Sequence, residues 1–288
     1  MAVLCGSQAA VAAGACVVLR GLRKGAAAWM PRVLLCAGCC LAAQAVTPVR
    51  AEDPPTVEVS GGGETGGHLW SVYSNTTVAL SGWLAGVPNS IREDGWRLRA
   101  GAGYWEYARR GSVCIQVPGP IPQCAERQAK LRRTGSFADL LLGYQAGLGA
   151  LTLKVFAGGV YANQQYRVDD EDDGSPGSFT AARVLVESWY NLTPDAFAQL
   201  DMGWMSRLDE ITARGRLGYR ITREISVGPE LSYWSADREF ESGRDDLVRF
   251  GGFVRYEWEG GEISASAGMT DGAEGRDFYA TLNALLRF

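Results

Sequence analysis

The sequence predicts an all-β fold: an antiparallel up-and-down transmembrane β-barrel of about 12 strands, with 10 as the alternative count. Three observations predict it. An alternating strand ends the chain at Phe288, extended runs fill most of the sequence before it, and tight and long links separate those runs. A soluble sandwich is the alternative interpretation, because periodicity alone does not say which face of a strand meets water.

The N-terminal part of the chain has the features of a secretory signal peptide, predicted over residues 1–51. No acidic residue precedes Glu52, basic residues flank the apolar run 33–43, and small residues at Ala45 and Ala51 offer cleavage sites. The run is too short to span a membrane as a helix. The signal peptide predicts export from the cytoplasm.

Two further features of the leader leave alternatives open. A compact leader starting at Met30 would make residues 1–29 a misassigned start. The stretch Leu35-Cys-Ala-Gly-Cys39 resembles a lipobox, so a lipid anchor is an alternative to cleavage.

The exported part divides into a lead-in and one domain. Residues 52–67 are rich in Pro, Gly and acid and are expected to be flexible, with the barrel domain over residues 68–288. Without the leader, 23 basic residues (28 − 5) face 32 acidic ones, a net charge of about −9, which argues against nucleic acid as a partner. The pair Cys114 and Cys124 predicts a disulfide. We expect no metal and no cofactor.

Extended runs separated by turn residues follow, with no amphipathic helix among them. The predicted strands are residues 69–80, 95–107, 136–146, 150–166, 179–191, 196–206, 211–220, 225–234, 247–258, 262–268 and 277–288. A single-chain bacterial barrel has an even number of strands. The twelfth is therefore expected from residues 56–60 or from a split of residues 69–84.

The links between these runs differ in length. The tight links are residues 147–149, 191–195, 222–224 and 259–261; the longer or more polar ones are 109–135, 167–178, 235–246 and 270–276. Short turns at one end and long loops at the other are typical of outer-membrane barrels. With the C-terminus in the periplasm, the tight links face the periplasm and the Cys114–Cys124 loop faces outward.

The last strand has one apolar face, because Phe278, Ala280 and Leu282 alternate with more polar residues. It resembles the last strand of outer-membrane barrel proteins, which the barrel-insertion machinery reads. On that resemblance the insertion signal is Leu282, Ala284, Leu286 and Phe288.

Charged residues alternate with apolar ones inside the strands, and in a membrane barrel they line the lumen. The lumen-lining candidates are Arg97, Arg99, Trp105, Asp139, Gln145, Lys154, Arg183, Glu187, Trp189, Asp201, Arg214, Arg216, Arg220, Glu230, Arg249, Arg255 and Glu257. They predict either a paired ionic network that fills the barrel or an open polar conduit. The rings of Trp105, Tyr107, Phe156, Trp189 and Phe253 would also point inward.

Several short motifs resemble the bacterial cellulose biosynthesis protein BcsS family. They are Ala138-Asp-Leu-Leu-Leu-Gly-Tyr-Gln145, Val184-Leu-Val-Glu-Ser-Trp189, Ala213-Arg-Gly-Arg-Leu-Gly-Tyr-Arg220, Ser226-Val-Gly-Pro-Glu-Leu231 and Arg249-Phe-Gly-Gly-Phe253. The resemblance covers roughly residues 69–288. It implies an exported, outer-membrane protein tied to cellulose production in Gram-negative bacteria, and it implies no catalytic residues. For such a protein, the conduit would carry a neutral glucan chain, and the inward rings would stack on its sugars.

These observations predict a non-enzymatic outer-membrane barrel with an accessory or conduit role in cellulose or exopolysaccharide export. Its expected partners are outer-membrane lipid, the barrel-insertion machinery, and cellulose secretion components or the glucan chain. The alternative is a structural or adhesive barrel with a plugged lumen. An outer-membrane hydrolase is a third alternative, although His68 and Ser74 on one strand face would lie about 20 Å apart.

Overall fold

A computed structural model describes the backbone of residues 54–80, 90–117, 123–168, 171–172, 177–237, 244–272 and 275–288. Side chains are described in the same ranges, except at 109–126, 171–172, 208, 237 and 244–245. The predicted signal peptide, misassigned start and lipobox lie outside the described residues.

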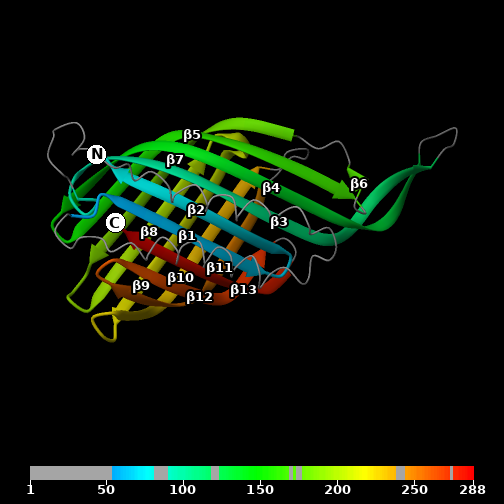
Figure 1. The fold of residues 1–288 in the computed structure, drawn as a ribbon. Helices are drawn as coiled ribbons and strands as arrows, with labels where there is room; N and C mark the ends of the chain where they lie inside the picture. Colours follow the sequence, from blue (N-terminus) through cyan, green and yellow to red (C-terminus); the bar gives the residue numbers. More distant parts are fainter. Residues whose placement is uncertain are drawn as a thin grey trace, which may run out of the picture. The chain divides into compact units, whose positions relative to one another are not determined.

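Twelve strands close an antiparallel barrel, which Figure 1 shows from the side. They are β1 (Val57–Gly66), β2 (Leu69–Ala79), β3 (Gly95–Val117), β4 (Gln123–Leu148), β5 (Leu151–Val168), β7 (Gly177–Asn191), β8 (Ala196–Met205), β9 (Glu210–Arg220), β10 (Ile225–Asp237), β11 (Arg244–Trp258), β12 (Gly261–Gly272) and β13 (Gly275–Arg287). Each strand pairs with its neighbours in the sequence, and β1 pairs with β13 to close the ring. The predicted fold is confirmed, and among the described residues no helix is long and apolar enough to cross a membrane.

The twelfth strand is β1, so the barrel starts at Val57 and not at residue 68. The expectation of a flexible lead-in over residues 52–67 is wrong for this stretch. The glycines in this stretch suggested a loop. In the structure, β1 pairs along both edges: with β2 on one side, and with β13 on the other, from Glu58 opposite Arg287 to Gly66 opposite Tyr279. Pairing on both sides outweighs the weak strand propensity of glycine.

We call the end of the barrel that carries Val57 and Phe288 the base, and the opposite end the rim. At the base, the backbone N–H groups of Thr56 and Val57 both donate to the Phe288 carbonyl, at 2.7 and 3.0 Å. One long connection also lies at the base, over residues 80–94 between β2 and β3. The sequence predicted tight links at the end that carries the C-terminus, and this connection is an exception.

The predicted long loop over residues 109–135 is mostly strand. The strands β3 and β4 continue as a hairpin beyond their other partners, because β2 reaches only Tyr107 and β5 reaches only Leu131. A short strand, β6 (Glu171–Asp172), pairs with the rim end of β5. Figure 1 shows the β3–β4 hairpin extending from the rim.

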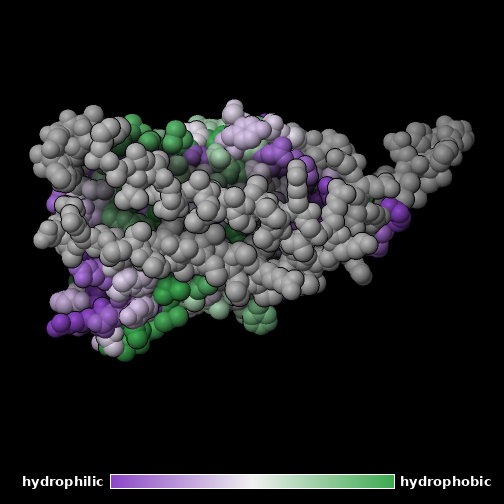
Figure 2. All heavy atoms as spheres, viewed as in Figure 1, coloured by the Kyte–Doolittle hydropathy of each residue, from purple (hydrophilic) through white to green (hydrophobic). Residues whose placement is uncertain are grey.

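The outer wall carries a belt of exposed apolar side chains. Leu142, Leu217, Leu231 and Phe250 are half exposed, and Phe278 is 72% exposed, which a soluble core would not allow. Exposed aromatics lie in two groups: Trp96, Tyr144, Tyr190, Tyr219 and Trp258 near the base, and Tyr161, Trp204 and Tyr233 nearer the rim. An apolar band between two aromatic girdles is the outer surface of a bilayer-spanning barrel. Figure 2 shows apolar side chains on the visible wall and hydrophilic ones at the turns of the base.

Candidate functional site

The candidate site is the barrel lumen, because contacts between strands that are not neighbours must pass through it. Arg99 on β3 pairs with Glu187 on β7, three strands away around the ring. Lys154 Nζ on β5 lies 3.5 Å from Glu58 Oε1 on β1, four strands away. Arg249 donates from both terminal nitrogens to Glu64 on β1, at 2.6 and 2.7 Å. Polar side chains therefore cross the interior of the barrel.

The structure places every lumen-lining candidate on the inner side of its strand. Most of them meet in pairs: Asp139 with Arg183, Lys154 with Glu187, Asp201 with Arg214, Arg216 with Glu230, and Arg255 with Glu257. Four of the other charged partners, Glu58, Glu64, Glu262 and Arg287, were missed by sequence reasoning. Glu58 and Glu64 lie at alternating positions of residues 57–66, so both face the lumen if that stretch is a strand. Predicting them therefore required predicting the whole of β1.

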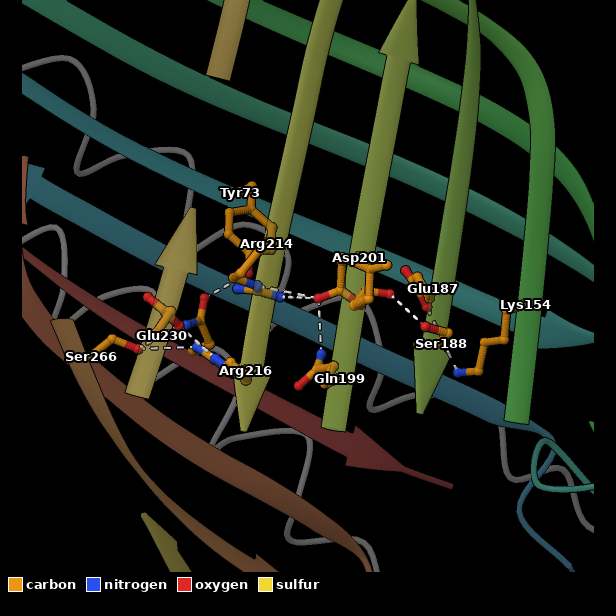
Figure 3. A network of polar contacts seen from close by, with 12 residues as sticks. Tyr73, Lys154, Glu187, Ser188, Gln199, Asp201, Arg214, Arg216, Glu230 and Ser266 are labelled. Carbon is orange, nitrogen blue, oxygen red and sulfur yellow. Dashed lines mark hydrogen bonds and ion pairs between the residues drawn. The ribbon is translucent and has the colours of Figure 1, made fainter. Parts of the chain in front are cut away.

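One row of charges follows the strand register of β5, β7, β8 and β9. Lys154 lies opposite Glu187, Glu187 opposite Asp201, and Asp201 opposite Arg214. Two carboxylates directly opposite each other repel. Arg214 Nη2 lies 2.7 Å from Asp201 Oδ2 (Figure 3). Arg99 reaches across to Glu187, so each carboxylate has its own cation.

A second cluster is buried around Glu230. Its Oε2 accepts from Arg216 Nε at 2.5 Å and from Ser266 Oγ at 3.0 Å (Figure 3), and its Oε1 accepts from Tyr279 Oη at 3.3 Å. The side chains of Arg216 and Glu230 are 4% and 2% exposed. A buried ion pair of this kind needs further hydrogen bonds to offset its desolvation, and Ser266 and Tyr279 supply them. The sequence did not single out these two residues.

Glycines on the inner wall make room for inward aromatic rings. Tyr279 on β13 reaches Glu230 on β10 over Gly251, where an added Cβ would lie 2.8 Å from Tyr279 Oη. Phe197 covers Gly218 in the same way, with 2.1 Å between its Cζ and an added Cβ. The glycine frequency of the chain thus reflects ring packing in the lumen as well as turns.

The base half of the lumen is filled. Phe197 stacks on Trp189 with ring centroids 4.0 Å apart, and the Arg255 guanidinium lies 4.5 Å from the Trp189 ring centre. Phe156 and Phe197 are each 1% exposed, and Phe253 is 5% exposed. Of the rings expected to stack on sugars, Phe156 and Phe253 are buried by protein and Trp189 is covered by Phe197. A continuous aromatic track for a glucan is therefore not formed through this half.

Residues 90–94 lie across the base. The Arg97 side chain is fully buried and donates to the carbonyls of Trp96, Ser90 and Glu93. Gln145 also donates to the Glu93 carbonyl, at 3.1 Å, and Arg92 donates to the Glu259 carbonyl in the β11–β12 turn. These contacts join opposite parts of the base, so this segment adds to the closure made by the side chains.

The interior beside β7–β9 has more space. The inward side chains of Arg214, Glu187 and Arg183 are 35%, 31% and 28% exposed, although they lie within the barrel wall. Toward the rim, the Arg133 guanidinium lies over the rings of Trp105 and Tyr166, at 5.3 and 4.6 Å. The described side chains thus pack against one another in the base half of the lumen, and side chains accessible to water lie above them.

Two predicted features are not decided by these contacts. The register sets Cys124 opposite Gln116 and Cys114 opposite Glu126, and both cysteine side chains lie outside the described ones. The disulfide stays a prediction. Leu282 of the predicted insertion signal faces outward, and its recognition by the insertion machinery also stays a prediction.

A family model described as cellulose biosynthesis protein BcsS matches residues 65–288 of this chain. Among curated proteins, none matches it. Similar solved structures include the translocator domain of the autotransporter NalP from Neisseria meningitidis, at 10% identity over 90% of this chain and 98% of that chain, with a TM-score of 0.47. The transport unit of the autotransporter AIDA-I from Escherichia coli is 12% identical over 88% and 97%, with a TM-score of 0.46. A KdgM porin is 9% identical over 80% and 99%, with a TM-score of 0.40.

Proposed function

Because the chain belongs to the cellulose biosynthesis protein BcsS family, we propose that it serves cellulose production as an outer-membrane accessory barrel whose closed lumen does not pass the glucan. On this proposal the protein is no enzyme and needs no cofactor. Its partners are outer-membrane lipid, the barrel-insertion machinery that assembles it, and components of the cellulose secretion apparatus.

The observation that carries the proposal is the set of contacts that cross the base half of the lumen. Lys154 with Glu58, and Arg255 with Trp189, each join strands four places apart in the ring. A barrel of 12 strands lies between the side-chain-filled barrels of 8 and the open channels of 16–18. In this chain, large side chains and residues 90–94 occupy the base half, which supports an accessory role over a conduit.

A second candidate is a structural or adhesive barrel. The β3–β4 hairpin favours it, because this hairpin extends beyond the barrel at the rim, past the last residues that pair with β2 and β5. Such an arm offers a surface outside the membrane.

Deletion of the gene in a cellulose-producing bacterium tests the proposal. We expect the exported cellulose to fall severalfold and to be restored by the wild-type gene. A second complementing gene lacks residues 109–128, the part of the hairpin beyond the barrel. Restoration by this variant supports the barrel accessory, whereas failure with normal barrel assembly supports the adhesive arm. Unchanged cellulose in the deletion strain would contradict both roles in production.

A further inference from the structure

The water-accessible part of the lumen is built from paired charges that retain open faces. Arg214 and Asp201 are 35% and 22% exposed, whereas Arg216, two residues nearer the base on the same strand, and its partner Glu230 are 4% and 2% exposed. The space for water or a ligand in the lumen therefore begins at the level of Asp201 and Arg214.

Tyr73 marks the floor of this space. It projects from β2 toward Arg214 on β9, on the opposite side of the ring, and lies within electrostatic reach of it (Figure 3). Its hydroxyl donates to Asn283 Oδ1 at 2.6 Å. We call the six residues Tyr73, Asp139, Arg183, Asp201, Arg214 and Asn283 the lumen floor.

Several buried polar atoms in and beside the lumen floor have no partner among the described residues. They are Asp139 Oδ1, Asn283 Nδ2, Arg99 Nε and Thr281 Oγ1. Asp139 is 7% exposed and uses only its Oδ2 on Arg183. These atoms are closed to solvent, so they do not themselves offer contacts to a ligand. The exposed sides of Asp201 and Arg214 do, because a carboxylate accepts hydrogen bonds, a guanidinium donates them, and the hydroxyl groups of a ligand do both.

The charge of the lumen floor selects the ligand class. Two carboxylates, Asp139 and Asp201, are balanced by two guanidinium groups, Arg183 and Arg214. A charged ligand would lose its hydration here without a net counter-charge, which is costly. A neutral ligand rich in hydroxyls meets no such cost.

From these observations we infer that the lumen floor binds a neutral β-glucan segment that enters from the rim. The inference rests on the proposed function, which supplies cellulose as the glucan, and it adds a site where an accessory barrel would hold the chain. Because the base is closed, the segment is held there and does not pass through.

Calorimetric titration of the refolded full barrel in detergent with cellohexaose tests the inference. The variant Asp201→Asn/Arg214→Gln removes both charges of one pair and leaves no unpaired partner. The matched control Asp271→Asn/Arg276→Gln removes an exposed pair, 48% and 72% exposed, outside the lumen floor. Heat-modifiable migration on gels establishes that all three proteins are folded.

We expect the wild type and the control to bind cellohexaose with equal affinity, and the lumen-floor variant to bind at least tenfold more weakly. An acidic hexasaccharide should bind none of them measurably. No wild-type binding at millimolar cellohexaose, or equal binding by the folded lumen-floor variant, would overturn the inference. The cellulose output of the deletion strain is independent of these titrations, so failure of the site and failure of the proposed function are told apart.

Discussion

At the residue scale, the barrel interior depends on rings that pack over glycines. Replacing Gly218 with Ala sets a Cβ against the Phe197 ring, which is itself 1% exposed and has no room to move. Overpacking of this kind costs about 1–3 kcal/mol. We expect Gly218→Ala to lower the urea midpoint of unfolding in lipid vesicles, followed by tryptophan fluorescence.

The same strand offers a control. An added Cβ at Gly215 on β9 meets nothing within 4 Å. Gly215→Ala should therefore leave the urea midpoint unchanged or raise it slightly. Equal loss of stability in both variants would show that the ring packing over Gly218 is not the cause.

Arg97 is a second residue with a definite structural role, because its buried guanidinium holds residues 90–94 at the base. Without it, the carbonyls of Ser90 and Glu93 each lose a donor and keep the Glu93 N–H and the Gln145 side chain, respectively. We expect Arg97→Ala to speed tryptic cleavage after Arg92 at least tenfold, measured by mass spectrometry of the fragments. Arg276→Ala, at the exposed rim, is the control, and cleavage no faster in Arg97→Ala than in this control would contradict the anchoring role.

At the element scale, the outer parts of β3 and β4 pair with each other through their backbones, and within the described residues neither pairs there with a third strand. Their other neighbours stop at Tyr107 and Leu131, so the barrel ring is complete without the hairpin. Replacing residues 109–128 with a two-residue turn should leave the gel-shift melting temperature within a few degrees of the wild type. A barrel that no longer folds would show that the hairpin is part of the stable unit.

The last strand is the other element with a testable role. The Phe288 backbone accepts from Thr56 and Val57 and donates to the Val57 carbonyl, so it joins the first strand to the last. We expect deletion of Phe288 to reduce the heat-modifiable protein in the outer-membrane fraction severalfold, with the unfolded form accumulating. Substitution of Phe278, which is also outward but lies at the rim end of β13, should have a smaller effect. Equal yields of wild type and deletion would contradict the insertion signal.

The elements also show what the sequence could predict. Strict alternation, as in Val248 and Phe250 against Arg249, gave the strands and their two faces. Strand ends were not predicted where alternation is lost, as in residues 109–130. Residues 56–60 were one of two candidates for the twelfth strand, but the glycines that follow hid the rest of β1. The ion pairs in the lumen could not be predicted from the sequence. Pairs such as Arg99 with Glu187 join strands that are not neighbours, and these strands face each other only because the barrel closes.

At the scale of the whole molecule, the barrel combines an apolar outer wall with an interior that is filled at the base and accessible above it. The outer belt fits lipid, and the interior pairs fit a protein that is held in the membrane without a through-passage. The BcsS family links this architecture to cellulose production. The central claim is that the lumen is closed.

Conductance across a planar bilayer tests that claim most directly. A control variant changes Glu58, Arg99, Lys154 and Glu187 to Ser, which removes two positive and two negative crossing charges together. With equal insertion shown by heat-modifiable migration, we predict no stable current steps from the wild type and measurable steps from this variant. Stable, reproducible steps from the wild-type barrel would contradict the closed lumen and favour a conduit.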